Sequence, residues 1–282
     1  EQAAGLEAAG VDLFVIETMM TLSDARAAVL AVRSVSNKPI MVTFTCDESG
    51  RSLSGTDVTA ALTVLQGMGI DAFGLNCSAG PAEMLPQLRR LREFAAVPLI
   101  AKPNAGMPEI ADGKTVYNCT PEKFVELVPE LLQAGVAVFG GCCGTNEGHI
   151  AALARALEKA EIVPPAPLHA DMLPASTEKL PFYLPADSGH GDVLTVTERF
   201  EDELDEAMAN GDAMVAVGIA SWDDVEALAD FQYMISKPMC IVCDDAELLE
   251  AALRVYQGRA LYEGTLSEAE LLPLCEKYGV II

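Results

Sequence analysis

The stretch VDLFVIET, residues 11–18, is an apolar run that ends in two polar residues, Glu17 and Thr18. Four further runs of this kind follow it, at residues 39–46, 71–78, 98–106 and 137–144. Helical patterns separate the runs, over residues 22–35, 58–69, 82–94 and 121–135. Near-continuous apolar strands that alternate with helices are typical of a parallel sheet covered on both faces. The sequence therefore predicts an α/β fold with about five βα units in residues 1–163.

The polar residues of these units share one location, the carboxyl end of a strand. They are Glu17, Asn76, Cys77, Asn104, Cys142 and Cys143. In a (β/α)8 TIM barrel this edge carries the catalytic residues. A doubly wound open sheet is the alternative, but no G-x-G-x-x-G follows the first strand. Ser23 and Thr120 are predicted N-caps of the helices that follow them.

Residues 164–191 form a Pro-rich stretch without helix or strand periodicity, and we interpret it as a linker. The βα pattern resumes over residues 192–282, which predicts a second, partial βα domain. Its expected strands lie at residues 192–200, 212–220, 237–245, 258–266 and 278–282, and its expected helices at 200–211 and 245–258. The chain is thus expected to divide into a barrel domain (1–163), a linker (164–191) and a second domain (192–282).

Charge and composition exclude several classes of function. The formal net charge of −24 argues against a nucleic-acid partner, because such binding depends on Lys and Arg that neutralise phosphates. No uncharged apolar run reaches the roughly 18 residues of a membrane span, and the first residues lack a signal-peptide pattern. Eight cysteines at irregular positions do not resemble a secreted disulfide framework. We expect a cytoplasmic protein with no membrane partner.

Three cysteines, Cys77, Cys142 and Cys143, come from two strand ends that a parallel sheet brings to one edge. The glycines around the adjacent pair permit unusual backbone angles, so both thiols are able to face one point. Three converging thiolates suit Zn²⁺, and three protein ligands with an open fourth position are typical of catalytic zinc. From the residues alone, inert buried thiols remain the alternative.

The segments GVDLFVIETM (10–19), GLNCS (74–78), KPNAG (102–106) and GGCCGTNEGHI (140–150) resemble, in this order, the homocysteine S-methyltransferase family. This family includes the zinc barrel of cobalamin-dependent methionine synthase, and the resemblance covers residues 1 to about 160. It implies that Cys77, Cys142 and Cys143 are zinc thiolates. It also implies that Asn104 is an exchangeable metal ligand and that Glu17 binds the homocysteine amino group. From their chemistry alone, Glu17 is also suited to capping a neighbouring helix or pairing with a lysine of the barrel, and Asn104 to stabilising the turn before Gly106.

The resemblance further implies the reaction, transfer of a methyl group to the thiol of homocysteine to give methionine. Methylcobalamin is a possible donor, on a separate domain or protein, because the chain contains no D-x-H-x-x-G corrinoid motif. The alternatives are the same zinc chemistry with another donor, such as betaine or S-methylmethionine, or with another thiol acceptor. A non-catalytic zinc-binding fragment or paralogue is the alternative from a different class.

Residues 192–282 resemble the start of the pterin-binding barrel that follows the zinc barrel in methionine synthase. The polar positions of that family are replaced here by Ala216, Gly218, Val242, Cys243, Asp244 and Glu263. Because a buried pterin ring needs polar partners, we expect a degenerate domain that does not bind folate. The family's DG-x-x-GT opening motif is also missing. We therefore expect an incomplete barrel, with its N-terminal units lying outside this sequence.

Some candidate residues receive no role in this chemistry. We expect Cys240 and Cys243 to be core thiols, because a strand points them to opposite faces, and metal or redox use is the alternative. His149, after the paired cysteines, is expected to cap or pack on the next helix. His169 and His190 lie in the predicted linker and receive no role.

Overall fold

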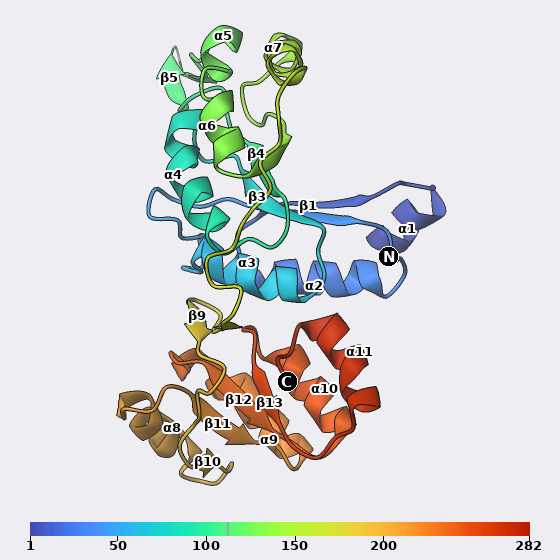
Figure 1. Cartoon of the computed structure of the whole chain (residues 1–282), viewed down its shortest axis with the longest axis vertical. Helices are drawn as coiled ribbons and strands as arrows, with labels where there is room; N and C mark the ends of the chain where they lie inside the picture. The colour runs from blue at the N-terminus through green and yellow to red at the C-terminus, as the bar shows by residue number, and fades with distance from the viewer. Residues whose placement is uncertain (112) are drawn as a thin grey trace. The chain divides into compact units, whose positions relative to one another are not determined.

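The computed structural model describes residues 1–111 and 113–282 (Figure 1). The chain forms two compact units. The first unit comprises residues 1–58 and 70–168, and the second comprises residues 59–69 and 169–282. The helix α3 (Val58–Gly67), which connects two strands of the first unit, therefore belongs almost entirely to the second.

The first unit is built on a parallel sheet with the strand order β1-β2-β3-β4-β7. Its strands are β1 (Phe14–Met19), β2 (Ile40–Phe44), β3 (Ala72–Asn76), β4 (Leu99–Lys102) and β7 (Val136–Phe139). Each strand lies beside the next one of the βα series, as in a (β/α)8 barrel, whereas a doubly wound sheet reverses direction at a switch point. The predicted α/β class and the five βα units are confirmed. Among the described residues the sheet stays open, with β1 and β7 at its edges.

The helices of the first unit alternate with its strands, and those at residues 2–8 and 147–157 lie outside the predicted helical ranges. They are α1 (Gln2–Ala8), α2 (Leu22–Arg33), α4 (Pro81–Arg92), α5 (Pro121–Phe124), α6 (Val128–Gln133) and α7 (Glu147–Leu157). The helix predicted over residues 121–135 is divided into α5 and α6, because Pro129 supplies no backbone N–H and belongs at the start of a helix. A short hairpin, β5 (Glu109–Ala111) with β6 (Lys114–Val116), precedes α5.

One of the two predicted N-caps is correct. Thr120 caps α5, and its hydroxyl accepts a hydrogen bond from the Lys123 N–H. The prediction of Ser23 as the N-cap of α2 is wrong, because Thr21 holds that position in an extended conformation and accepts from the Asp24 N–H. Thr21 is the last residue before the helical turn closes, so its side chain alone reaches the free N–H groups.

The core of the first unit consists of the apolar strand residues and the helix faces turned toward them. Phe44 and Phe73 on neighbouring strands are fully buried, with ring centroids 5.8 Å apart. A second cluster, formed by Phe124, Val128 and Leu153, joins the three helices that flank β7. Each such side chain contributes about 1.5–3 kcal/mol when it is removed from water. This packing fixes the strand ends that carry the polar residues.

The second unit contains a four-stranded parallel sheet in the order β10-β11-β12-β13. The strands are β10 (Val193–Leu194), β11 (Val215–Gly218), β12 (Met239–Val242) and β13 (Leu261–Glu263), all shorter than predicted. Besides α3, the described helices of this unit are α8 (Phe200–Ala209), α9 (Trp222–Phe231), α10 (Ala246–Val255) and α11 (Glu268–Tyr278), with a 3₁₀ turn, η1 (Gln232–Met234). The βα pattern predicted for this region is confirmed by the parallel sheet.

The strand predicted over residues 278–282 is wrong. Tyr278 is the last residue of α11, and Gly279, with φ of +71°, ends that helix in the left-handed conformation. Only Ile281 then pairs with the sheet, through a single bridge to Leu261. A left-handed glycine is a common helix terminator, and here the helix occupies the start of the range predicted as a strand.

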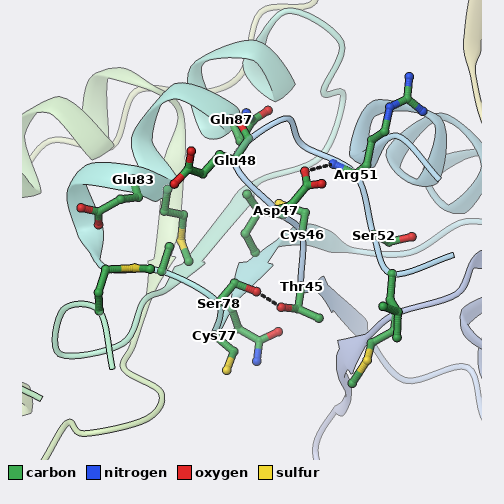
Figure 2. Close-up of a pocket in the computed structure, with 17 residues that line it drawn as sticks. Thr45, Cys46, Asp47, Glu48, Arg51, Ser52, Cys77, Ser78, Glu83 and Gln87 are labelled. Atoms are coloured by element: carbon green, nitrogen blue, oxygen red, sulfur yellow. Dashed lines mark hydrogen bonds between the residues drawn. The ribbon is translucent and has the colours of Figure 1, made fainter. Parts of the chain in front are cut away.

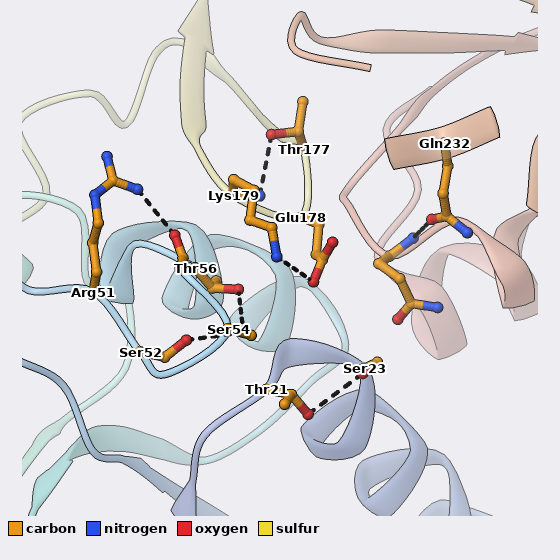
Figure 3. A network of polar contacts seen from close by, with 12 residues as sticks. Thr21, Ser23, Arg51, Ser52, Ser54, Thr56, Thr177, Glu178, Lys179 and Gln232 are labelled. Carbon is orange, nitrogen blue, oxygen red and sulfur yellow. Dashed lines mark hydrogen bonds and ion pairs between the residues drawn. The ribbon is translucent and has the colours of Figure 1, made fainter. Parts of the chain in front are cut away.

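The predicted linker is more ordered than its composition indicates. Within residues 164–191, β8 (Leu173–Ser176) and β9 (Pro181–Leu184) pair as an antiparallel hairpin. The Thr177 hydroxyl accepts from the N–H groups of Lys179 and Leu180, and Lys179 pairs with Glu178 in the turn (Figure 3). Side chain-to-backbone turns of this kind need no periodic pattern, which is why the sequence did not predict the hairpin. The boundaries of the domains at residues 163 and 192 stay predictions.

Within the described ranges, every helix falls short of the length and apolar content that crossing a bilayer requires.

Candidate metal and substrate site

The three cysteines singled out in the sequence lie together at the carboxyl edge of the first unit's sheet. Cys77 directly follows β3, and Cys142 and Cys143 follow β7. The sulfur atoms of Cys77 and Cys143 are 3.8 Å apart, and those of Cys142 and Cys143 are 4.0 Å apart. All three sulfurs lie within 4.8 Å of one another. Cys143 is exposed and the other two are half-buried, so the cluster is open to solvent on one side.

Cys77 takes its position from a strained turn. Its φ is +59° and that of Ser78 is +58°, so two consecutive residues with side chains occupy the left-handed region. Such residues cost about 1–3 kcal/mol each and concentrate at functional sites. The Cys77 N–H still donates to the Lys102 carbonyl at 3.2 Å, which keeps the turn attached to β4. The turn directs the thiol away from the path of the strand.

The turn that carries Cys142 and Cys143 is attached to the segment after β4. The Cys142 N–H donates to the Pro103 carbonyl, and the Cys143 carbonyl accepts from the Ala105 N–H, both at 2.9 Å. Gly144 follows with φ of +79°, a conformation that a side chain would strain. These constraints place two adjacent sulfurs on the same side of the chain, which a regular strand forbids.

His149 secures the helix that begins after this turn, as the sequence predicts. Asn146 is the N-cap of α7, and the two side chains form a reciprocal capping box. The His149 Nε2 lies 2.8 Å from the Cys119 carbonyl, and its ring packs edge-on against Phe124. The residue is buried and structural.

Two buried amides support the cysteine turns. The Asn104 Oδ1 accepts from the Cys143 N–H at 3.0 Å, and Asn104 is only 3% exposed. Asn76, 1% exposed, donates from Nδ2 to the Thr18 hydroxyl at 2.7 Å and to the Cys142 sulfur at 3.8 Å. Its Oδ1 accepts from the N–H of Thr18, which itself has φ of +61°. Asn76 therefore ties the ends of β1 and β3 to one of the three sulfurs.

Glu17 forms an ion pair with Lys102, across the ends of β1 and β4. The structure thus places Glu17 against a lysine, one of the alternative roles that its chemistry allows. The carboxylate is still 39% exposed, and the stem of Lys102 lies along Gly140. This ion pair lies at the carboxyl edge of the sheet, the edge that also carries the three cysteines.

Tyr117 is a residue of the site that the sequence did not indicate. Its ring packs against Gly144, so closely that a Cβ on that glycine would overlap it. Burial of the hydroxyl, together with the neighbouring Cys143, Cys77 and Cys142, raises the pKa of Tyr117. The tyrosine lies in an irregular loop between β6 and α5, where no periodicity or spacing marks it. Thr18 and Asn76 were placed at strand ends by the sequence, but the contacts of Asn76 with Thr18 and with the Cys142 sulfur became evident only in three dimensions.

A pocket of about 640 Å³ opens beside Cys77 (Figure 2). The loop after β2, the turn after β3 and the start of α4 form its walls. Asp47, Glu48 and Glu83 line it together with Arg51, so acidic groups outnumber basic ones. Hydrogen bonds from the Arg51 N–H and from Ser49 lower the pKa of Asp47, which keeps that carboxylate charged.

Cys46, in the same pocket, is a different kind of thiol. Its burial raises its pKa to about 11, so it stays protonated near neutral pH. A protonated thiol is a poor nucleophile, and Cys46 lies outside the three-cysteine cluster. The pocket therefore gives access to one candidate thiolate, Cys77.

The three sulfurs fit a divalent zinc ion. Zn–S bonds of about 2.3 Å in a tetrahedron place sulfurs about 3.8 Å apart, close to the two separations observed here. Thiolates are soft ligands and favour zinc over magnesium or calcium. A centre with three sulfurs keeps one tetrahedral position for a further ligand.

The fold and the site together define an α/β protein that presents three converging thiols at the carboxyl edge of a parallel sheet. The chain belongs to the homocysteine S-methyltransferase family, which its sequence matches over residues 1–157. The resemblance inferred from the sequence motifs is thereby confirmed.

The chain is also similar to individual proteins. The chain is 36% identical over 163 residues to methionine synthase from Mycobacterium tuberculosis, and 35% identical over 165 residues to methionine synthase from Mycobacterium leprae. Each match covers 56% of this chain but only 14% of the relative. A crystal structure of the homocysteine methyltransferase MmuM from Escherichia coli, in its apo form, superposes with a TM-score of 0.46 at 24% identity, over 55% of this chain and 53% of that one.

Proposed function

We propose that the first unit transfers a methyl group to the thiol of homocysteine at a zinc ion held by Cys77, Cys142 and Cys143. The observation that carries the proposal is the convergence of three thiols from two distant segments, at separations that suit one tetrahedral ion. Membership in the homocysteine S-methyltransferase family, for which zinc is typical, supplies the reaction class.

Cys77, Cys142 and Cys143 would hold the zinc ion, and the chemistry it would supply is to lower the pKa of a substrate thiol so that the nucleophilic thiolate forms. The residues of the chain hold the centre in shape. Asn76 donates to the Cys142 sulfur, and Asn104 fixes the backbone of Cys143. We propose that the second lone pair of the Asn104 oxygen is the exchangeable ligand when substrate is absent, since an amide oxygen is easily displaced.

We propose that Glu17 binds the amino group of homocysteine. The carboxylate is partly exposed and lies at the strand edge, and an ammonium group is able to share it with Lys102 or to replace that lysine. In the transfer itself, a sulfur lone pair of homocysteine forms the new S–CH₃ bond. The bond between the methyl group and its donor breaks, and its electron pair stays with the donor.

We propose a methylated corrinoid on another domain or protein as the methyl donor. The support is the similarity to two methionine synthases, of which this chain spans 14%. We propose no folate site in the second unit, because the buried Ala216 and the glycine at 218 offer no side-chain hydrogen bonds to a polar ring. The eight free cysteines support a reducing, cytoplasmic location.

The test is an assay of the zinc-loaded chain with homocysteine and methylcobalamin, with methionine measured by mass spectrometry. We expect methionine to form, and we expect Cys77→Ala to abolish it, because two sulfurs no longer complete the centre. Cys119→Ala is the matched control, since Cys119 is a half-buried thiol of the same unit outside the cluster.

The donors are distinguished by parallel reactions with betaine and with S-methylmethionine. Methionine formed only from one of these would replace the corrinoid while leaving the acceptor chemistry intact. Zinc binding without methionine from any of the three donors would contradict the proposed activity and favour a zinc-binding module.

A further inference from the structure

The second unit contains another group of metal-binding side chains, His190, Cys240 and Glu263. One ligand atom of each lies within 4.8 Å of those of the other two. The residues come from three separate segments: the stretch before β10, the middle of β12 and the end of β13. They belong to none of the sites described above.

The register of the sheet explains why two of them meet. Cys240 pairs with Leu261, and Val242 pairs with Glu263. Because side chains two residues apart share a face, Cys240 and Glu263 lie on the same face of neighbouring strands. Cys240 is 3% exposed and packs with Met214 and Ala216, so its sulfur faces a dry environment on one side.

The segment after the hairpin β8–β9 brings the histidine to this face. Leu184, at the end of β9, packs on the cluster around Cys240, and six residues later the His190 Nε2 lies 3.0 Å from the Glu263 Oε2. The His190 Nδ1 lies 2.7 Å from the Gly191 carbonyl. A carbonyl oxygen only accepts, so Nδ1 carries a hydrogen and Nε2, aimed at Glu263, is the nitrogen that is able to coordinate.

A histidine held in this way is typical of metal sites, where the second ring nitrogen donates to a carbonyl or carboxylate and fixes the ring. The neighbouring thiol of Cys243 provides a contrast. It is also 3% exposed, but it lies 3.2 Å from the Asp245 carbonyl and is satisfied by the backbone. The Cys240 thiol faces a carboxylate and an imidazole instead.

We propose that His190, Cys240 and Glu263 form a second binding site for a thiophilic divalent cation, zinc or cobalt, separate from the three-cysteine centre. Nitrogen, sulfur and carboxylate oxygen are the three ligand types that zinc accepts, and solvent at the exposed side of Glu263 supplies the fourth position. The sulfur selects against magnesium and calcium. A bound ion connects β12 and β13 to the segment that crosses their face, and thereby stabilises the second unit.

The experiment uses the full chain with Cys77→Ala and Cys143→Ala, which leaves the three-cysteine centre one sulfur. After treatment with a chelator, this variant is titrated with Co²⁺, and the sulfur-to-cobalt charge-transfer band is followed. We expect one equivalent of Co²⁺ to bind with this band, and Zn²⁺ to displace it. Adding Cys240→Ala to the variant removes the band, whereas adding Cys243→Ala retains it.

His190→Gln and Glu263→Gln give a second test of cation binding, because neither substitution alters the hydrophobic core. Each replaces a ligand by a neutral side chain of similar size, and each is expected to weaken Co²⁺ binding at least tenfold, within the range seen when single metal-site partners are removed. The thermal unfolding midpoint of the Cys77→Ala/Cys143→Ala chain should rise with Zn²⁺ and not with Mg²⁺.

The proposal is overturned if the chain without the first centre binds no Co²⁺, or if the band survives both Cys240→Ala and His190→Gln. An equal stabilisation by Mg²⁺ also contradicts it, because that result requires a site of oxygen ligands alone. None of these outcomes bears on the methyl-transfer proposal, which concerns only the first unit.

Discussion

At the candidate metal site, several residues have a strained backbone or a buried polar side chain. The fold itself does not require either feature. Thr18, Cys77 and Ser78 hold left-handed backbone angles, although none of them is glycine. Asn76 offsets part of this cost, because it bonds the backbone and the hydroxyl of Thr18 and also reaches the Cys142 sulfur. Its side chain is 1% exposed, so it has no access to water as a replacement partner.

Asn76→Ala is therefore expected to weaken zinc binding by about 10–100-fold, the usual effect of removing a residue that orients metal ligands. The measurement is a competition titration against a chromogenic zinc chelator, in the Cys240→Ala chain so that only the first centre is measured. Asn118→Ala is the control, because Asn118 is an exposed asparagine of the same unit that donates to Glu109. An unchanged zinc affinity for Asn76→Ala would show that Asn76 does not orient the sulfurs.

The connection between β7 and α7 is the element on which the centre depends most. It contains both adjacent cysteines, the left-handed Gly144 and the capping box of Asn146 with His149. The sequence indicated the strand and the thiols and placed His149 on the helix that follows, but it did not identify Asn146 as the N-cap of that helix. It did not indicate Tyr117, which comes from another loop and packs on Gly144.

Gly144→Ala tests this element against a matched position. Gly144 and Gly10 both have φ of +79°, but a Cβ meets nothing within 4 Å at Gly10 and overlaps the Tyr117 ring at Gly144. Both substitutions carry the backbone strain, about 1–2 kcal/mol. Of the two variants, only Gly144→Ala is expected to lower the affinity for zinc. Gly144→Ala is also expected to reduce the free energy of unfolding more than Gly10→Ala does. The two quantities are measured by chelator competition and by urea denaturation, and equal losses for the two variants would contradict the role of the turn.

Across the whole molecule, the sequence predicts the regular strands and helices better than the local structure that single side chains determine. The five βα units of the first unit followed from apolar runs and helical periodicity, and the family followed from short motifs. Misses occurred where side chains determine local structure: Pro129 divides a helix, Thr21 replaces Ser23 as a cap, and the β8–β9 hairpin lies in a Pro-rich stretch. The contacts of Asn76 and Tyr117 join segments far apart in the chain, which no local pattern encodes.

Zinc K-edge X-ray absorption of the Cys240→Ala chain, loaded with one equivalent of zinc, tests the central claim most directly. We predict three sulfur ligands and one lighter ligand without substrate, and four sulfur ligands after homocysteine is added, because its thiol takes the fourth position. Two or fewer sulfurs before homocysteine, or a shell that homocysteine leaves unchanged, would contradict the account.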